Sequence, residues 1–243
     1  MNKKKKVASF LMAGVLLLGL PFGAIAAETK KKDTKTVQYV ALGDSLAAGQ
    51  TPDGYIDYGY ADYIADNFKK SKYKLSDFDN FGVPGYTSEK LKNDLLKSKK
   101  IQKEVKEATH ITIDIGANDL LPKIKTDPAN AKDVIPVVAS NLDSILKQID
   151  NLNKKVKVYV MGYYNPFPYY PQAQQDALLP LLTGLNGQIE AVAKKNKDTY
   201  VATEKQIASK YSDYITNPTD IHLSSAGYKV LATQFWAAIA KKK

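Results

Sequence analysis

The sequence predicts an α/β domain of three layers, in which a five-stranded parallel sheet lies between two layers of helices. Two observations predict this class. Strand candidates alternate with segments of helical spacing, which is the pattern of strands joined by helical crossovers. The chain of 243 residues is 44% hydrophobic and 25% charged, which suits a single globular domain with a sizeable core.

The first 26 residues have the pattern of a secretory signal peptide. A basic run, Lys3 to Lys6, precedes an apolar stretch at 7–20, and Ala24-Ile25-Ala26 is a small-x-small cleavage pattern. We therefore predict a secreted, extracellular protein, cleaved after Ala26 or Ala27. An uncleaved membrane anchor is the alternative, and it is disfavoured because the apolar stretch is short for a membrane span.

The remaining chain divides into a leader and one domain. The polar residues 27–36 are expected to form a mobile leader, and 37–243 a single domain without internal repeat or second linker. Removal of the signal segment lowers the net charge of +10 by four, because Lys3 to Lys6 have no acidic counterpart there. The other lysines are dispersed, which argues against nucleic-acid binding. Attraction to an anionic cell-wall or membrane surface fits better, although a solvated face explains the charge equally simply.

The absence of cysteine excludes several kinds of site. Without cysteine there is no lipid-anchor attachment, disulfide framework, zinc–thiolate site or thiol nucleophile. Two histidines offer little to a metal ion, so we expect neither metal nor organic cofactor. We also expect a monomer.

The first half of the chain gives two strand–turn units. An apolar strand at 37–42 ends at Gly43-Asp44-Ser45, and after a polar loop the 60–68 segment has helical spacing. The segment 79–87 is dense in turn formers, and Thr87 marks the start of the next helix. A β-branched strand at 110–115 then ends at a second polar turn, 116–119.

The second half repeats this alternation. A helix is predicted at 127–152, a strand at 155–161, and an aromatic, proline-rich loop at 162–171. Helical spacing returns at 174–195, with interruptions expected near Pro180 and at 184–187. A short strand at 199–202 and a loop at 217–224 lead to the last helix, for which Ser224 is a plausible N-cap.

Candidate chemical groups gather at one edge of this sheet. Crossover connections make neighbouring strands parallel, so all strand C-termini meet at the same edge. Ser45, Gly85, Asn118, the 162–171 loop and His222 therefore converge. On its own stretch, Ser45 is equally well explained as a nucleophile or as the N-cap of a helix.

His222 is the candidate general base. The other histidine, His110, starts a strand at the opposite edge and is most simply a strand-end residue. Asp220 lies two residues before His222, so its carboxylate can accept the imidazole Nδ1–H and leave Nε2 facing the nucleophile. A serine hydroxyl needs such a base, because it is almost un-ionised at neutral pH.

An oxyanion hole can form at the same edge. Acyl transfer passes through a tetrahedral intermediate whose negative oxygen needs donors. The backbone N–H groups of Ser45 and Gly85 and the side-chain amide of Asn118 are the candidates, with Gly82 as the competing glycine. We interpret Asp44 and Asp119 as turn-forming or supporting carboxylates, and Asp114 receives no role.

Four short blocks now resemble a known family. G-D-S at 43–45, N-x-G-x-x-G-x-T at 80–87, G-A-N-D at 116–119 and D-x-H at 220–222 resemble, in order, the motifs of the SGNH, or GDSL-type, esterases and lipases. The resemblance implies a flavodoxin-like sheet, a catalytic triad of Ser45, Asp220 and His222, and an oxyanion hole formed by Ser45, Gly85 and Asn118. The G-x-S-x-G elbow of the α/β-hydrolases is absent.

The expected activity is hydrolysis of carboxylic esters through an acyl-enzyme. Lipid or short-chain acyl esters are the first choice, because an apolar acyl wall could form from the aromatic residues Tyr163, Tyr164, Phe167 and Tyr169. These side chains could equally be exposed-loop aromatics that only pack on a neighbouring loop. Removal of O-acetyl groups from a cell-wall or plant polysaccharide is the second choice. A non-catalytic module that binds glycan or a membrane surface is the alternative of another class.

Overall fold

The computed structural model describes residues 35–241, so the predicted signal peptide and most of the predicted leader lie outside the described residues. Five strands form one parallel sheet in the order β2-β1-β3-β4-β5. Their bounds are β1 Thr36–Gly43, β2 Lys74–Gly82, β3 His110–Asp114, β4 Lys157–Met161 and β5 Thr199–Val201. This is the flavodoxin-like order, and its topological switch point lies between β1 and β3.

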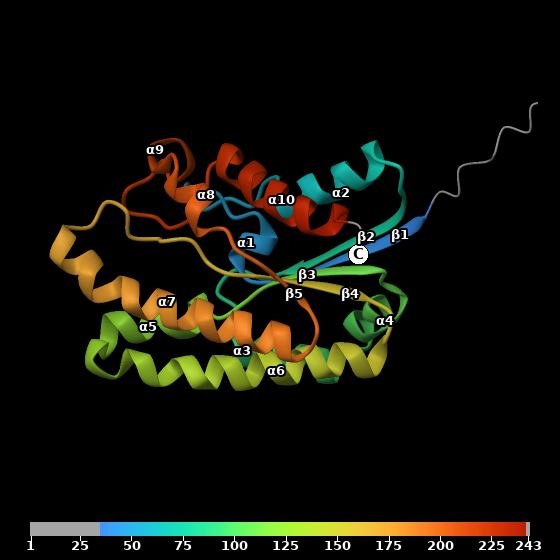
Figure 1. Cartoon of the computed structure of the whole chain (residues 1–243), viewed down its shortest axis with the longest axis horizontal. Coiled ribbons are helices and arrows are strands. Elements are labelled where there is room, and N and C mark those ends of the chain that lie inside the picture. Colours follow the sequence, from blue (N-terminus) through green and yellow to red (C-terminus); the bar gives the residue numbers. More distant parts are fainter. Residues whose placement is uncertain (1–34, 242–243) are drawn as a thin grey trace, which may run out of the picture. The chain divides into compact units, whose positions relative to one another are not determined.

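Helices cover both faces of the sheet, as the sequence predicted. One layer contains α3 to α7, and the other contains α1, α2, α8, α9 and α10 (Figure 1). The bounds are α1 Ser45–Ala48, α2 Tyr60–Lys70, α3 Ser88–Lys97, α4 Lys99–Glu107, α5 Ala117–Thr126, the 3-10 helix η1 Pro128–Val134, α6 Ile135–Leu152, α7 Gln172–Lys195, α8 Glu204–Ala208, α9 Tyr211–Tyr214 and α10 Ser225–Ala240. Within 35–241, no helix combines the length and the hydropathy needed to cross a membrane.

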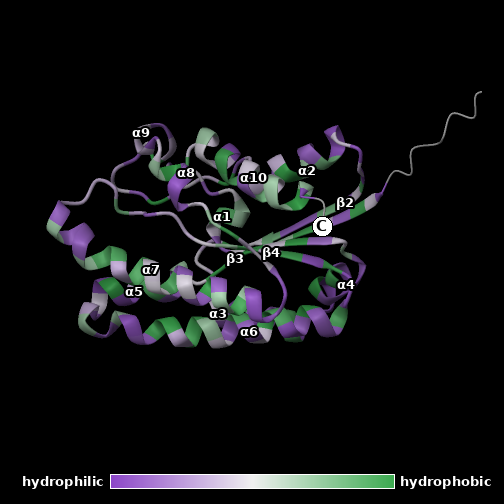
Figure 2. Cartoon of the chain, viewed as in Figure 1, coloured by the Kyte–Doolittle hydropathy of each residue, from purple (hydrophilic) through white to green (hydrophobic). Residues whose placement is uncertain are grey.

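The two central strands form the core. β3 is buried along its whole length, and β1 is buried from Tyr39 to Gly43, because helices cover both faces of these strands. Figure 2 shows hydrophobic residues along the middle of the sheet and many hydrophilic residues on the helices around it. Each fully buried Val, Leu or Ile side chain contributes about 1.5–3 kcal/mol to folding. The site at the end of β1 thus rests on the most densely buried part of the domain.

Three predicted segments differ from the structure. β2 runs to Gly82, whereas we expected turns from residue 79; it is an edge strand, and its polar residues keep one side in solvent. The polar turn expected at 116–119 continues directly into α5. The interruptions expected near Pro180 and at 184–187 do not occur, because α7 is continuous and packs on α6, with Gly184 against Ile135.

Candidate active site

Ser45 lies where β1 ends and α1 begins. Asp44, not Ser45, is the N-cap of α1, because its carboxylate accepts the Leu46 N–H at 3.0 Å. The Ala47 N–H donates to the Asp114 Oδ2 at 3.3 Å. Among residues 35–241 the Ser45 N–H has no hydrogen-bond partner. The tight turn therefore leaves one backbone donor free, beside the serine hydroxyl.

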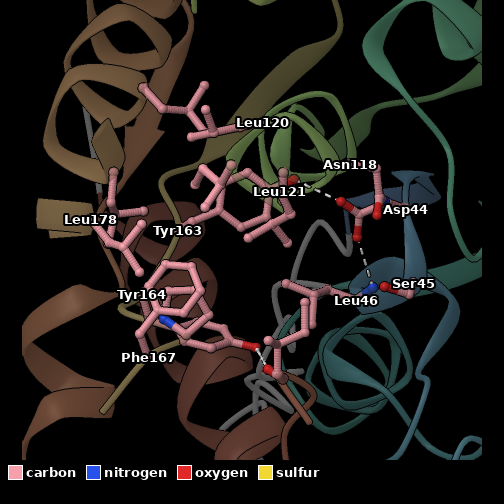
Figure 3. A pocket seen from close by; sticks show the side chains of 16 residues that line it. Asp44, Ser45, Leu46, Asn118, Leu120, Leu121, Tyr163, Tyr164, Phe167 and Leu178 are labelled. Carbon is pink, nitrogen blue, oxygen red and sulfur yellow. Dashed lines mark hydrogen bonds between the residues drawn. The ribbon is translucent and has the colours of Figure 1, made fainter. Parts of the chain in front are cut away.

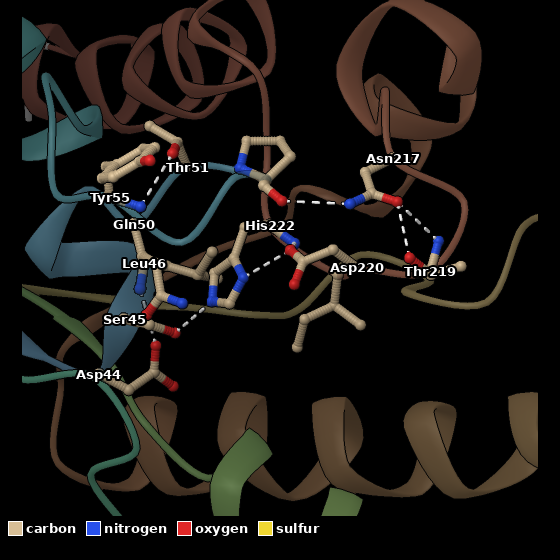
Figure 4. Close-up of polar contacts among 12 residues, drawn as sticks. Asp44, Ser45, Leu46, Gln50, Thr51, Tyr55, Asn217, Thr219, Asp220 and His222 are labelled. Carbon is tan, nitrogen blue, oxygen red and sulfur yellow. Dashed lines mark hydrogen bonds and ion pairs between the residues drawn. The ribbon is translucent and has the colours of Figure 1, made fainter.

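His222 is hydrogen-bonded to both expected partners. Its Nε2 lies 2.8 Å from the Ser45 Oγ, and its Nδ1 lies 2.7 Å from the Asp220 Oδ1 (Figure 4). The same Asp220 oxygen accepts the His222 backbone N–H at 2.8 Å, which fixes the turn that joins the two residues. Because a carboxylate accepts the Nδ1–H, the Nε2 lone pair faces the serine hydroxyl. The three predicted triad residues thus form one chain of hydrogen bonds.

Gly85 and Gly82 have different roles in their shared loop. Gly82 packs so closely on α1 that a Cβ there would lie 2.3 Å from the Ala48 nitrogen, and its N–H donates to Asn80 at 2.9 Å. Gly85 has a left-handed φ of +76°, and its N–H has no acceptor among the described residues. Of the two glycines, the one with a free donor is therefore Gly85, which the sequence favoured.

Asn118 is in the first turn of α5 and is tied to the Gly85 loop. Its Nδ2 donates to the carbonyl oxygen of Tyr86 at 3.0 Å. An amide nitrogen carries two hydrogens, so this bond fixes the side chain and leaves one donor. Asp119 accepts both the N–H and the hydroxyl of Ser88, at 2.8 and 2.7 Å, and so holds the start of α3 beside the same loop. This is the supporting role expected for Asp119.

A largely apolar pocket opens beside Ser45. Its polar margin consists of Asp44, Ser45 and Asn118, and most of its other wall comes from α5, the β4–α7 loop and α7 (Figure 3). Apart from Asn118, the lining side chains from the two helices are all aliphatic: Ala117, Leu120, Leu121, Ile124, Leu178, Leu182 and Leu185. The helical leucines were not predicted as pocket residues, since their spacing is the same as that of core residues.

The four predicted substrate-binding aromatics divide into two groups. Tyr163, Tyr164 and Phe167 line the pocket, but they are buried, not exposed as expected. Two of them are fixed by their hydroxyl groups: Tyr163 donates to Asp44 at 2.8 Å and Tyr164 to the Ile221 carbonyl at 2.7 Å. Tyr169 is not among the residues that line this pocket; it is partly exposed and donates to the Ile215 carbonyl. Its predicted substrate contact stays a prediction, and within the described residues its hydroxyl closes a loop.

Comparisons with known proteins point to one family of enzymes. Residues 41–230 match the model of the GDSL-like Lipase/Acylhydrolase family. The chain is 28% identical to YpmR of Bacillus subtilis, over 96% of this chain and 95% of that one. It is 25% identical to the spore germination lipase LipC of Bacillus licheniformis, over 84% and 96%.

Solved structures share the fold. The lipase Lip_vut3 from a goat rumen metagenome superposes with a TM-score of 0.71 at 22% identity, over 84% of this chain and 97% of that chain. The acetylxylan esterase Axe2 from Geobacillus stearothermophilus superposes with a TM-score of 0.66 at 19% identity, over 87% and 97%. The predicted fold class is thereby confirmed.

Proposed function

Because this chain belongs to the GDSL-like lipase and acylhydrolase family, we propose that it is a secreted serine esterase that takes apolar acyl chains. The observation that carries the proposal is the hydrogen-bonded series Ser45–His222–Asp220 at the margin of an apolar pocket. The predicted signal peptide supports export.

The proposed reaction forms and then hydrolyses an acyl-enzyme. The Ser45 oxygen attacks the ester carbonyl while its proton passes to Nε2 of His222, and Asp220 stabilises the imidazolium. The tetrahedral intermediate collapses, and His222 returns the proton to the leaving alcohol. Water, activated by the same imidazole, then attacks the acyl-enzyme and releases the acid and Ser45.

Three donors are placed to stabilise the intermediate. The free N–H of Ser45 comes from α1, the free N–H of Gly85 from the loop between β2 and α3, and the second Nδ2 hydrogen of Asn118 from α5. The bond from Asn118 to Tyr86 fixes the amide before substrate arrives. Such preorganised donors favour the transition state because they need no reorientation as charge develops.

The pocket favours acyl chains longer than acetate. Acetyl places one methyl group beyond the carbonyl, and the aliphatic side chains of α5 and α7 would then stay without apolar substrate contacts. Each further buried methylene is worth about 0.8 kcal/mol.

Hydrolysis of nitrophenyl esters from acetyl to palmitoyl by the protein 27–243 tests this proposal, with the Ser45→Ala variant as control. We expect kcat/KM to rise beyond acetate and activity to be lost in the variant. Activity on acetate alone would instead favour deacetylation of glycans. Absence of turnover on every ester would favour a binding module and contradict the proposed function.

A further inference from the structure

Asp114 is a buried acid beneath the Ser45 turn that the proposed reaction does not use. It is the last residue of β3 and is fully buried. Its Oδ2 accepts the N–H of Asp44 at 3.1 Å and that of Ala47 at 3.3 Å. One carboxyl group on the neighbouring strand thus holds the backbone on both sides of Ser45.

Gly43 makes this approach possible. A Cβ at position 43 would lie 2.6 Å from the Asp114 Oδ1 and 2.5 Å from the Asp114 carbonyl oxygen, and the residue has a φ of +154°. A side chain at this position would displace the carboxyl group or the strand. The first residue of the G-D-S block therefore accommodates Asp114.

Asp44 contributes a second carboxyl group to the same network. Its side chain accepts the Leu46 N–H at 3.0 Å and the Tyr163 hydroxyl at 2.8 Å, and its backbone N–H donates to the Asp114 carboxyl group. Tyr60 donates to the Oδ1 of Asp114. Both acids are almost completely buried, and neither forms an ion pair within the described part of the chain.

Two adjacent buried carboxylates without a paired cation cannot both keep their charge at neutral pH. Burial and the charge of Asp44 raise the pKa of Asp114 well above its usual range. Burial raises the pKa of Asp44 too, but Asp114, the Leu46 N–H and the Tyr163 hydroxyl act to lower it, so the rise is larger at Asp114. The stable arrangement has one proton, and Asp114 holds it.

We propose that Asp114 is a positioning residue for the nucleophile: its carboxyl group, which accepts the N–H groups of Asp44 and Ala47, holds residues 44–47 so that the Ser45 hydroxyl and N–H face the substrate. This inference rests on the proposed esterase function. Asp114 acts only through the turn. Misplacement of a reacting group by about 1 Å is enough to cost about 100-fold in rate, so loss of this anchor should lower kcat.

Two variants test whether the hydrogen bonds of the Asp114 side chain, and not its charge, position the turn. Asp114→Asn keeps the size and neutrality of the acid, with an oxygen that can accept the two backbone N–H groups and an NH2 group that can donate to Asp44. Its kcat should stay within about threefold of the wild type, whereas kcat of Asp114→Ala should fall roughly 10- to 100-fold with KM within about twofold. Circular dichroism checks that both variants fold.

Infrared spectroscopy tests the proton independently of turnover. The spectrum of the wild type minus that of Asp114→Asn at neutral pH should show the C=O stretch of a protonated carboxyl group. The same band should appear when Asp114→Asn is made in the Ser45→Ala background and its spectrum is subtracted from that of Ser45→Ala. A missing band would overturn the assignment of the proton to Asp114. The positioning role is overturned if Asp114→Asn is as slow as Asp114→Ala, or if Asp114→Ala keeps its kcat. A wild type that hydrolyses no ester would refute the esterase function, while the band would still decide the proton on Asp114.

Discussion

At the scale of single residues, the site depends on which backbone N–H groups already donate a hydrogen bond and which are free. In the turn after β1, the N–H groups of Asp44, Leu46 and Ala47 are bonded to carboxyl groups, and that of Ser45 is not. In the loop after β2, the Gly82 N–H is bonded and the Gly85 N–H is free among the described residues. Free donors therefore occur at the two positions where an oxyanion hole needs them.

Asn118 gives the residue-scale prediction. Replacement by alanine removes one of the proposed oxyanion donors and also releases the Tyr86 carbonyl. We expect kcat of Asn118→Ala to fall about 100- to 1,000-fold, with a much smaller change in KM, because the amide acts mainly in the transition state. Steady-state kinetics on a nitrophenyl ester measures both constants. A change confined to KM would mean that Asn118 only positions the substrate.

Much of the residue-scale site could be predicted because the choice of chemistry was narrow. With two histidines and no cysteine, the search for a base and a nucleophile left few candidates, and D-x-H placed a carboxylate beside one of them. The role of Asp114 could not be predicted in this way. Its bonds to Asp44 join residues 70 positions apart, and only the register of β1 against β3 brings them together.

At the scale of elements, α5 and α7 build the wall of the pocket. Leu120 and Leu121 come from α5, and Leu178 and Leu182 from α7. In Figure 3, Leu178 lies on the side of the pocket opposite Ser45. Side chains of α7 thus set the far end of the pocket, whereas the proposed catalytic groups lie after β1, after β3 and in the loop between α9 and α10.

Shortening the pocket from its far end should change chain-length preference without changing the chemistry. We expect Leu178→Trp to lower kcat/KM for octanoyl and longer esters by roughly tenfold, because one or two methylenes in an apolar pocket are worth about 1–3 kcal/mol. Acetate hydrolysis should stay near the wild-type rate. Val137→Trp, at an exposed position on α6, is the matched control. An equal loss on all esters in Leu178→Trp would show that the pocket does not hold the acyl chain.

Elements with clear apolar periodicity or caps were the predictable ones. Helix α3 begins after Thr87 and α10 after Ser224, and both caps accept a backbone N–H of the first turn. The errors fell where packing overrides local preference. Pro180 does not break α7, and the polar run around Asp79 forms an edge strand because β1 supplies its hydrogen-bonding partner.

At the scale of the whole molecule, parallel topology assembles the site. The strand order places the switch point between β1 and β3, so Ser45 and Asn118 follow adjacent strands. His222 reaches them from the loop between α9 and α10. Alternation of strands and helices was enough to predict this convergence, whereas the depth and lining of the pocket depend on helix packing that the pattern does not encode.

The opposite end of the sheet gives a prediction about stability. His110, at the start of β3, is buried, and its Nε2 has no partner among the described residues. Burial, with a smaller contribution from Lys157, lowers its pKa from 6.5 to about 4. The unfolded chain therefore binds a proton on His110 between these values while the folded protein does not, so stability falls as the pH is lowered through this range.

His110→Phe should remove this dependence and keep the ring against Phe68 and Tyr159. The free energy of unfolding of the wild type, relative to that of the variant, should drop by about 2 kcal/mol between about pH 7.5 and pH 5. Urea unfolding at both pH values measures it. Because the other titrating groups are common to both proteins, an unchanged difference would contradict the buried neutral histidine.

Labelling with a fluorophosphonate, followed by mass-spectrometric mapping of the adduct, tests the central claim most directly. The reagent phosphonylates a serine oxygen only where a base and oxyanion donors activate it. We predict one adduct per chain, on the peptide that contains Ser45, and almost none in His222→Ala at equal exposure. A wild-type protein that stays unlabelled, or an adduct on another serine, would contradict the assignment of Ser45 and His222.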